Sequence, residues 1–270
     1  MELRVGTSGF SYDAWRGSFY PEDLPASRML SFYGRHLEAV EINNTFYRMP
    51  KAELLEGWAQ QVPAAFSFAL KAPRRITHIK KLRDVADEVA HLYRVAGALH
   101  ERRGPVLFQL PPYLRKDVEL LRDFLAALPE AHHAAVEFRH RSWLDDEVLD
   151  VLRASDAALC VADAGEDTDA PLAATAPFGY LRLRRQDYDE PALARWAERV
   201  HAQPWNGVWV FFKHEDEGIG PALAARFRSL FLDGRSLRVP AWRATREEAA
   251  AEAAPRRRRA QRGGTPSASS

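Results

Sequence analysis

Ionisable and amide side chains stand near the ends of short apolar runs in this sequence. Glu137 and Arg139 lie two residues apart in "AVEFRHRSW", and Glu41 and Asn43 repeat that spacing in "AVEINNTF". Residues two apart on a strand share one face, so each pair is predicted to point in one direction. Two carboxylates that meet in one pocket are natural candidates for a general acid and a general base.

A lysine, Lys71, ends a third run, "FSFALKAP", and lysine beside carboxylates allows two roles. If burial lowered its pKa, its amine could act as a Schiff-base nucleophile; as an ammonium group it would be the ion-pair partner that keeps Glu41 ionised. We favour the ion-pair role, since a lysine beside acids is normally protonated. The predicted catalytic residues are Glu41, Glu137 and Lys71.

Cations accumulate on the last two runs, "GYLRLR" and "VWVFFKH", and predict an anionic substrate. Barrels of alternating strands and helices often hold phosphate in the loops after the seventh and eighth strands. The alternative is that Arg184 and Arg185 form exposed ion pairs of little energetic weight with the glutamates of "EDE". The residues predicted to bind substrate are Asn43, Gln109, Arg139, Asp163, Arg182, Lys213, His214, Trp15, Tyr20, Tyr47 and Trp143.

A divalent metal is the less favoured prediction for the same site. Glu41, Glu137, Asp163 and His214 lie on different runs and could converge on Mg²⁺, Mn²⁺ or Zn²⁺. The chain has no H-x-x-x-H or C-x-x-C spacing, and several cations belong to the same predicted rim. We therefore expect no metal and no cofactor.

Eight short apolar runs alternate with stretches of helical spacing. This alternation predicts parallel strands in a single (β/α)8 TIM-like barrel over residues 1–242. A doubly wound open sheet is less favoured, because no glycine-rich phosphate turn follows the first run. The predicted strands are Leu3–Ser8, Ala39–Phe46, Phe66–Pro73, Pro105–Pro112, Ala134–His140, Ala158–Ala164, Gly179–Arg184 and Val208–His214; the predicted helices are Ser27–Leu37, Lys51–Gln61, Arg83–His100, Lys116–Leu128, Asp145–Ala154, Pro191–His201 and Pro221–Leu232, with none between the sixth and seventh strands.

The C-terminal rim of such a barrel is where the polar strand ends would meet. We predict that Glu41, Lys71, Glu137, Arg139 and Arg182 line one pocket there. The alternative is a salt-bridged layer inside the barrel, in which Glu137 only neutralises Arg139 or Lys71. The long first loop, "DAWRGSFYP", is predicted to place Trp15 and Tyr20 over the mouth, whereas most other aromatic residues pack in the core.

The totals describe an ordinary globular protein of 270 residues with a formal net charge of +1, which gives no overall attraction to nucleic acid or membranes. The single cysteine, Cys160, is expected to be a buried inert thiol, and neither a signal sequence nor a membrane span is recognisable, so a cytoplasmic protein is expected. Residues 243–270 have the composition of a disordered, arginine-rich tail. Weak contact of this tail with RNA or DNA is an alternative to a plain solvated tail.

Several blocks in one order also resemble a known family. They are "VGTSGFSYDAWRGSFYP", "VEINNTFYRMP", "FALKAPRRITH", "FQLPP", "VEFRHRSW", "YLRLRR" and "FFKHEDEG". In order and spacing they are similar to the YecE-like proteins, called domain of unknown function 72, over nearly the whole chain to about residue 232. The resemblance implies a TIM barrel of unestablished reaction, and its motif positions fall on Trp15, Tyr20, Glu41, Asn43, Phe46, Tyr47, Lys71, Gln109, Pro111, Glu137, Arg139, Trp143, Arg182 and Lys213. Many members have histidine and glycine where this chain has Arg184 and Arg185, so the seventh loop departs from the pattern.

The leading functional hypothesis is therefore an enzyme that acts on a small anionic substrate, phosphorylated or sugar-derived, by acid and base catalysis without a redox cofactor. A barrel that binds or processes nucleic acid, with or without a metal, is the alternative, because a cationic rim, aromatic residues and an arginine-rich tail suit it too. A noncatalytic sensor is a third hypothesis. The substrate, the reaction and the oligomeric state do not follow from the sequence.

Overall fold

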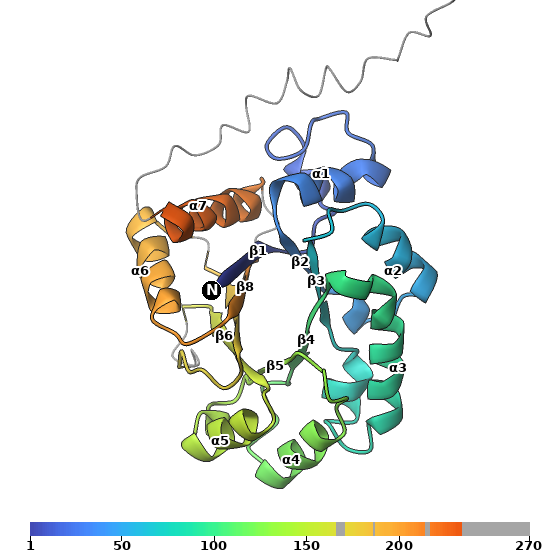
Figure 1. Cartoon of the computed structure of the whole chain (residues 1–270), viewed down its shortest axis with the longest axis vertical. Helices are drawn as coiled ribbons and strands as arrows, with labels where there is room; N and C mark the ends of the chain where they lie inside the picture. Colours follow the sequence, from blue (N-terminus) through green and yellow to red (C-terminus); the bar gives the residue numbers. More distant parts are fainter. Residues whose placement is uncertain (166–170, 186, 214–216, 234–270) are drawn as a thin grey trace, which may run out of the picture. The chain divides into compact units, whose positions relative to one another are not determined.

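Eight parallel strands close into a barrel in the computed structural model of the chain, which describes residues 1–165, 171–185, 187–213 and 217–233 (Figure 1). Each strand pairs with the next along the chain, and β1 closes the ring on β8 in six consecutive residue pairs. The predicted TIM-like barrel is confirmed. Its strands are β1 (Glu2–Ser8), β2 (Ala39–Ile42), β3 (Ser67–Lys71), β4 (Arg103–Gln109), β5 (Ala134–Glu137), β6 (Ala158–Asp163), β7 (Phe178–Leu183) and β8 (Gly207–Phe212).

Helices lie outside the ring of strands and cover it (Figure 1). Aspartates cap α4, α5 and α6 at their first turns, where Asp117, Asp145 and Asp189 accept hydrogen bonds from backbone amides that lack a partner within the helix. The described part of the connection between β6 and β7 contains no helix. The helices are α1 (Met29–His36), α2 (Ala52–Ala59), α3 (Ala86–Ala96), α4 (Val118–Ala126), α5 (Asp146–Ala154), α6 (Glu190–His201) and α7 (Ile219–Asp233).

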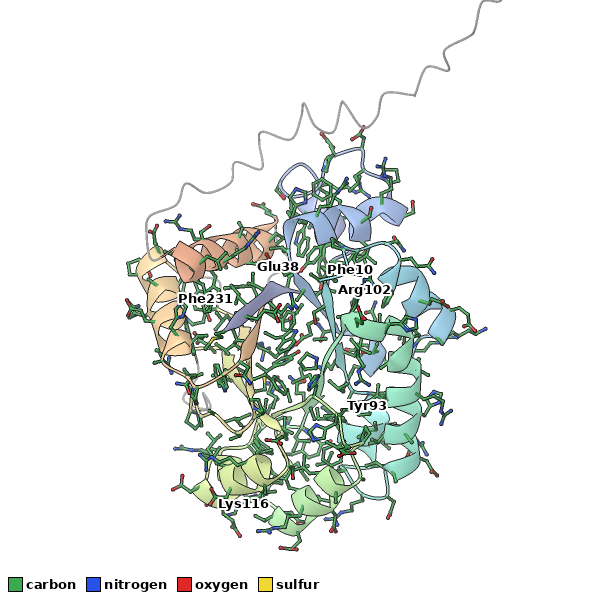
Figure 2. All side chains as sticks on the ribbon, in the orientation of Figure 1. Phe10, Glu38, Tyr93, Arg102, Lys116 and Phe231 are labelled. Atoms are coloured by element: carbon green, nitrogen blue, oxygen red, sulfur yellow. The ribbon has the colours of Figure 1, made fainter. Side chains whose placement is uncertain are left out.

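Side chains fill the interior of the barrel, as Figure 2 shows. The part of the interior nearer the N-terminal ends of the strands is an apolar layer, which includes Ala39, Ala69, Leu107, Cys160 and Phe211. Alternation along the strands then fixes which residues face inward above it: the interior side continues from Ala39 to position 41 on β2, and from Ala135 to position 137 on β5. The polar residues at the strand ends thus lie above an apolar floor.

Strands β2 and β5 end earlier than the sequence predicts. A single 3-10 turn over Asn44–Phe46 follows β2, and another over Arg141–Trp143 follows the loop after β5. Arg139 therefore lies beyond its strand, where strand alternation no longer fixes its direction. This is the main difference between the predicted and observed elements near the strand ends.

No helix in the described part of the chain is long and apolar enough to cross a membrane. The predicted boundary between residues 242 and 243 and the arginine-rich tail after it lie outside the described residues. His214 and the glutamates of "EDE" at 215 and 217 were predicted beside the eighth strand; of these, only Glu217 is described, and it is exposed.

Candidate functional site

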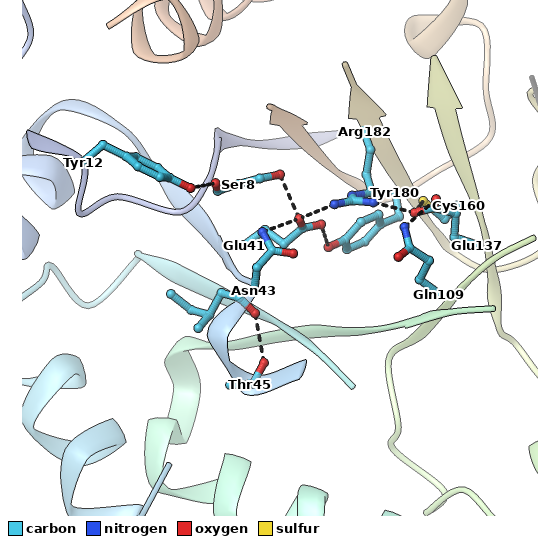
Figure 3. A network of polar contacts seen from close by, with 11 residues as sticks. Ser8, Tyr12, Glu41, Asn43, Thr45, Gln109, Glu137, Cys160, Tyr180 and Arg182 are labelled. Carbon is cyan, nitrogen blue, oxygen red and sulfur yellow. Dashed lines mark hydrogen bonds and ion pairs between the residues drawn. The ribbon is translucent and has the colours of Figure 1, made fainter. Parts of the chain in front are cut away.

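A buried ion network lies at the C-terminal ends of the strands, with Arg182 at its centre (Figure 3). One guanidinium nitrogen of Arg182 lies 2.9 Å from Glu41 Oε1, and another lies 2.7 Å from Glu137 Oε2. The side chains of Arg182, Glu41 and Glu137 are 3%, 0% and 2% exposed. Three residues far apart in the sequence, from β7, β2 and β5, therefore form one desolvated cluster.

Glu41 accepts hydrogen bonds from four side chains. Its Oε1 accepts from Arg182, from Ser8 Oγ at 2.8 Å and from Asn43 Nδ2 at 3.3 Å, and its Oε2 accepts from Tyr180 OH at 2.7 Å. Burial alone would raise the pKa of this carboxyl, but the charge of Arg182 and the donated hydrogen bonds outweigh burial and hold the pKa below its usual value. Glu41 is thus an ionised, fully bonded carboxylate.

Glu137 accepts from Arg182 on one oxygen and from Gln109 Nε2, at 2.7 Å, on the other. The thiol of Cys160 approaches the same carboxylate, with Sγ 4.0 Å from Oε2. Burial and the neighbouring Glu137 raise the pKa of this thiol well above its usual value, so it remains protonated at neutral pH. The expectation of a buried cysteine is confirmed, and its place is inside the barrel below the ion network.

The observed partner of Glu137 is Arg182, and the alternative pairing with Arg139 or Lys71 is wrong. Arg139 is exposed, since β5 ends two residues before it. Arg182 comes from β7 and forms ion pairs with both Glu41 and Glu137. The buried cluster therefore contains one positive charge and two negative charges. A salt-bridged interior layer is therefore present, built around a different cation from the one that the sequence suggested.

Lys71 ends β3 next to this network and is half-buried. Its Nζ lies 4.3 Å from the centre of the Phe46 ring. Burial, followed by the positive charge of Arg182, lowers the pKa of Lys71 to about 8, although Glu41 and Glu137 act in the opposite direction. Among the described residues, no carboxylate oxygen lies within 4.0 Å of Lys71 Nζ, which is the limit for an ion pair. The ion-pair role favoured from the sequence is therefore not observed.

Positive charge continues outward from Lys71 over the mouth. Burial lowers the pKa of His78, and Lys71, Arg74 and Arg139 lower it further through their charges. The ring of His78 lies edge-on to Phe46, with centroids 5.0 Å apart, and Lys213 adds to the positive charge around Lys71. Three cations, Arg74, Arg139 and Lys213, and the imidazole of His78 thus lie near the half-buried amine of Lys71.

Other predicted residues lie apart from this group. Asp163 faces away from the interior, where its Oδ2 accepts from Tyr188 OH at 2.7 Å and from Trp196 Nε1 at 3.1 Å. It ties the end of β6 to α6, because alternation on β6 puts Cys160 inside and Asp163 outside. Glu41, Glu137 and Asp163 therefore do not converge, and no group of three or more His, Cys, Asp or Glu suited to a metal occurs among the described residues.

The aromatic residues predicted at the mouth divide into buried and exposed ones. Trp15 and Tyr20 are 0% and 2% exposed within a cluster of rings, so neither offers a free face over the mouth and that prediction is wrong. Trp143 is buried as well, stacks on Phe138 and donates to Leu114 O. Tyr47 is 80% exposed and packs edge-on against Phe46, which keeps it available to a ligand.

Ser8 and Tyr180 belong to the network but were not predicted. Both had a signal in the sequence: Ser8 ends the first strand, and Tyr180 lies two residues before Arg182 and so shares its face. Tyr180 was given no role from the sequence, because a tyrosine among apolar residues is usually explained by the burial of its ring. Its hydroxyl, which donates to Glu41, is the part of the side chain that joins the network.

A cavity of about 420 Å³ lies at the opposite end of the barrel. It is lined by residues that begin strands or precede them, among them Glu2, His132, Phe178 and Gly207. TIM barrels carry their active sites at the C-terminal ends of the strands, so this cavity is separate from the candidate site.

The family model described as "Protein of unknown function DUF72" matches residues 4–247. Among curated relatives, the UPF0759 protein YecE of Escherichia coli (strain K12) is 35% identical over 112 residues, which is 41% of each chain, and the UPF0759 protein YunF of Bacillus subtilis (strain 168) is 30% identical over 135 residues, 47% of this chain and 48% of YunF. The matched segments thus span less than half the length of these two curated relatives.

Solved structures agree with the family match. A DUF72 family protein from Thermotoga maritima MSB8 superposes with a TM-score of 0.74 at 26% identity, covering 85% of this chain and 99% of that one. A DUF72 family protein from Enterococcus faecalis V583, 20% identical, has the same fold with a TM-score of 0.67 over 87% of this chain and 97% of that one. The family match over most of the chain and the shared barrel lead to one conclusion: this chain belongs to the DUF72 family.

Proposed function

We propose that this protein is an enzyme that acts on a small anionic substrate, by acid and base catalysis, at the C-terminal mouth of the barrel. One observation carries the proposal. Both inward-facing glutamates are bound to Arg182, so the cations above them, Lys71 and Arg139, have no carboxylate partner in the described part of the chain. An anion of the substrate is the partner that this charge distribution lacks.

The protonation states of Glu41 and Lys71 suit these two residues to different roles. Glu41 is ionised and fully hydrogen-bonded, which suits it to hold Arg182 and to fix the local field rather than to exchange protons. Lys71, with its pKa lowered to about 8, exchanges protons near neutral pH, where an effective general acid or base must have its pKa. Gln109 and Asn43, which donate to Glu137 and Glu41 respectively, orient the two carboxylates.

The substrate's anionic group is proposed to lie over Phe46 and Tyr47, among Lys71, His78 and Arg139. Lys213, one residue beyond β8, adds positive charge from the far side of the mouth. Positive charge on several strand ends favours a small, compact anion such as a carboxylate or a phosphate monoester, because each cation contributes only while it remains within a few ångströms.

Anion-dependent stabilisation tests this proposal. Thermal unfolding is followed in phosphate and in chloride at constant ionic strength, since a ligand at 100 times its Kd stabilises the fold by about 2.7 kcal/mol, or about 5–10 °C for a protein of this size. We expect the phosphate shift in the unaltered protein, a reduced shift in Lys71→Met and Arg139→Met, and an unchanged shift in Arg94→Met, an exposed arginine on α3. Equal shifts in all four proteins, or no shift in any, would overturn the proposal.

A further inference from the structure

We propose that Lys71 forms a Schiff base with the carbonyl group of a small anionic aldehyde or ketone, such as a keto acid or a sugar phosphate. This inference rests on the proposed function and names the substrate class for the same site. It assigns Lys71 a covalent role in place of simple proton transfer.

The first support is where the amine lies. Lys71 is the last residue of β3, on the interior side of the barrel, and its Nζ faces the Phe46 ring at 4.3 Å. Lys80 and Lys116, by contrast, each have a carboxylate within 3.0 Å, Glu88 and Asp145 respectively. Among the described residues Lys71 has no carboxylate within ion-pair distance, because Arg182 occupies both nearby glutamates.

The second support is the choice of residue type. Only six of the 38 basic side chains in the sequence are lysines, and the rest are arginines. Where the barrel needs a buried positive charge it uses Arg182, whose pKa burial opposes but Glu41 and Glu137 raise above its usual value. A guanidinium remains protonated and cannot attack a carbonyl, whereas an amine can. Lysine at position 71 therefore offers chemistry that the prevailing cation of this chain does not.

The surroundings keep part of this amine neutral. Burial, then Arg182, lowers the pKa of Lys71 to about 8. At pH 7.5 about one quarter of such an amine is unprotonated, against about one part in a thousand for an ordinary lysine with a pKa of about 10.4. Only the unprotonated form attacks a carbonyl carbon.

The covalent step is balanced without a further reactant. The nitrogen lone pair attacks the carbonyl carbon, a C–N bond forms, and the C=O bonding pair moves to oxygen. The C–O bond of this carbinolamine then breaks. Counted from the ammonium form, two of its three protons leave with the oxygen as water, and the third remains on the iminium, so the charge is +1 throughout and nothing is oxidised or reduced. An iminium acidifies the adjacent C–H bond, which connects this step to acid and base catalysis.

The cationic rim selects among carbonyl compounds. An anionic group on the carbon next to the carbonyl would lie toward Arg74 and Arg139, whose positive charges act together with that of Lys71 on His78. Neutral carbonyl compounds gain nothing from that charge. We therefore expect pyruvate and dihydroxyacetone phosphate to react faster than acetone.

Reductive trapping tests the inference. The full-length protein is incubated at pH 7.5 with pyruvate, dihydroxyacetone phosphate or acetone and with cyanoborohydride, which reduces only the iminium, and the modified lysine is located by peptide mass spectrometry. Lys51, exposed at the start of α2, is the internal control within the same molecule. We expect the anionic probes to label Lys71 at least about tenfold faster than Lys51, in line with its larger neutral fraction. Lys71→Arg should lose this label and keep the phosphate-induced thermal shift, because it retains the charge.

The outcomes separate the two proposals. Labelling of Lys71 no faster than Lys51, with the phosphate shift retained, refutes the Schiff base and leaves the anion-binding proposal standing. Loss of both refutes both. Equal rates with acetone and with pyruvate would refute the anionic substrate class. The labelling ratio is measured in the unaltered protein, so it does not depend on whether a variant folds.

Discussion

Replacing Arg182 by methionine is the sharpest perturbation of the buried network. Methionine has a comparable length and no charge, so Arg182→Met leaves Glu41 and Glu137 in the barrel without a counterion. Both carboxylates are almost fully desolvated, so solvent screening is negligible there. The carboxylates of Glu41 and Glu137 must then either remain buried without a counterion or become protonated.

The size of the effect follows from the burial. Breaking a buried ion pair by removing one partner destabilises a protein by about 3–5 kcal/mol, and we take about 5 kcal/mol here because one guanidinium serves two carboxylates. That is a large part of the total stability of a domain, about 5–15 kcal/mol. With an m value of about 3 kcal/mol per molar urea, the unfolding midpoint falls by about 1.7 M.

The pH dependence should differ between the two proteins. In the unaltered protein the pKa of Glu41 is lowered, so its contribution is complete above the unfolded value of about 4.3 and is lost as the pH falls below it. In Arg182→Met, burial without a counterion should raise the pKa of Glu41. Stability is then gained as the pH falls from 7 toward 4.3, because protonation removes the buried charges.

Urea unfolding at pH 7 and pH 5, followed by circular dichroism, decides the matter. The triple variant Glu41→Gln, Glu137→Gln, Arg182→Met removes all three charges and should recover at least half of the loss. Arg153→Met, an exposed arginine paired with Asp150 on α5, is the control and should change stability by less than about 1 kcal/mol. A midpoint for Arg182→Met within 0.3 M of the unaltered protein, or no recovery in the triple variant, would refute the reasoning.

Three further predictions address other parts of the structure. The amine of Lys71, which Arg182, Glu41, Glu137, Lys213 and His78 surround, should gain reactivity toward acetic anhydride with a midpoint near pH 8, and a midpoint near the ordinary lysine value of about 10.4 would contradict its lowered pKa. Asp163→Asn should lower the free energy of unfolding by about 1–3 kcal/mol by weakening the bonds from Tyr188 and Trp196, yet leave the phosphate-induced thermal shift unchanged; loss of that shift would place Asp163 in the site. Gly6→Ala should destabilise the barrel by about 2 kcal/mol or more, because its Cβ would lie 1.7 Å from Ala39 O, whereas Gly57→Ala on α2, with nothing within 4 Å, should stabilise by about 0.5–1 kcal/mol; equal effects would show that β1 and β2 are not so close.

The barrel and the convergence of Glu41, Glu137 and Arg182 were predictable from the sequence. Strand alternation gives each residue its face, and closure of parallel strands brings their C-terminal ends together. Glu41 and Glu137 are separated by nearly 100 residues, yet both bind one guanidinium as that geometry requires.

Which cation binds which carboxylate was not predictable from spacing. Arg139 was predicted to share the face of Glu137 because both were assigned to one strand, but the strand ends at Glu137 and Arg139 is exposed. The prediction that Trp15 covers the mouth was wrong for another reason. The sequence shows a long loop rich in aromatic residues, but it does not show that their rings pack against one another. Asp163 could have been assigned correctly, since Cys160 on the same strand sets the opposite face inward.

The location of a bound anion tests the central claim most directly. Crystals soaked in selenate, whose anomalous scattering marks its position, should show the anion over the C-terminal mouth, between Lys71 and Arg139 and above the Phe46 ring. Selenate found only in the cavity at the opposite end of the barrel, beside His132 and Phe178, or absent from the mouth at a concentration that shifts thermal unfolding, would contradict the account.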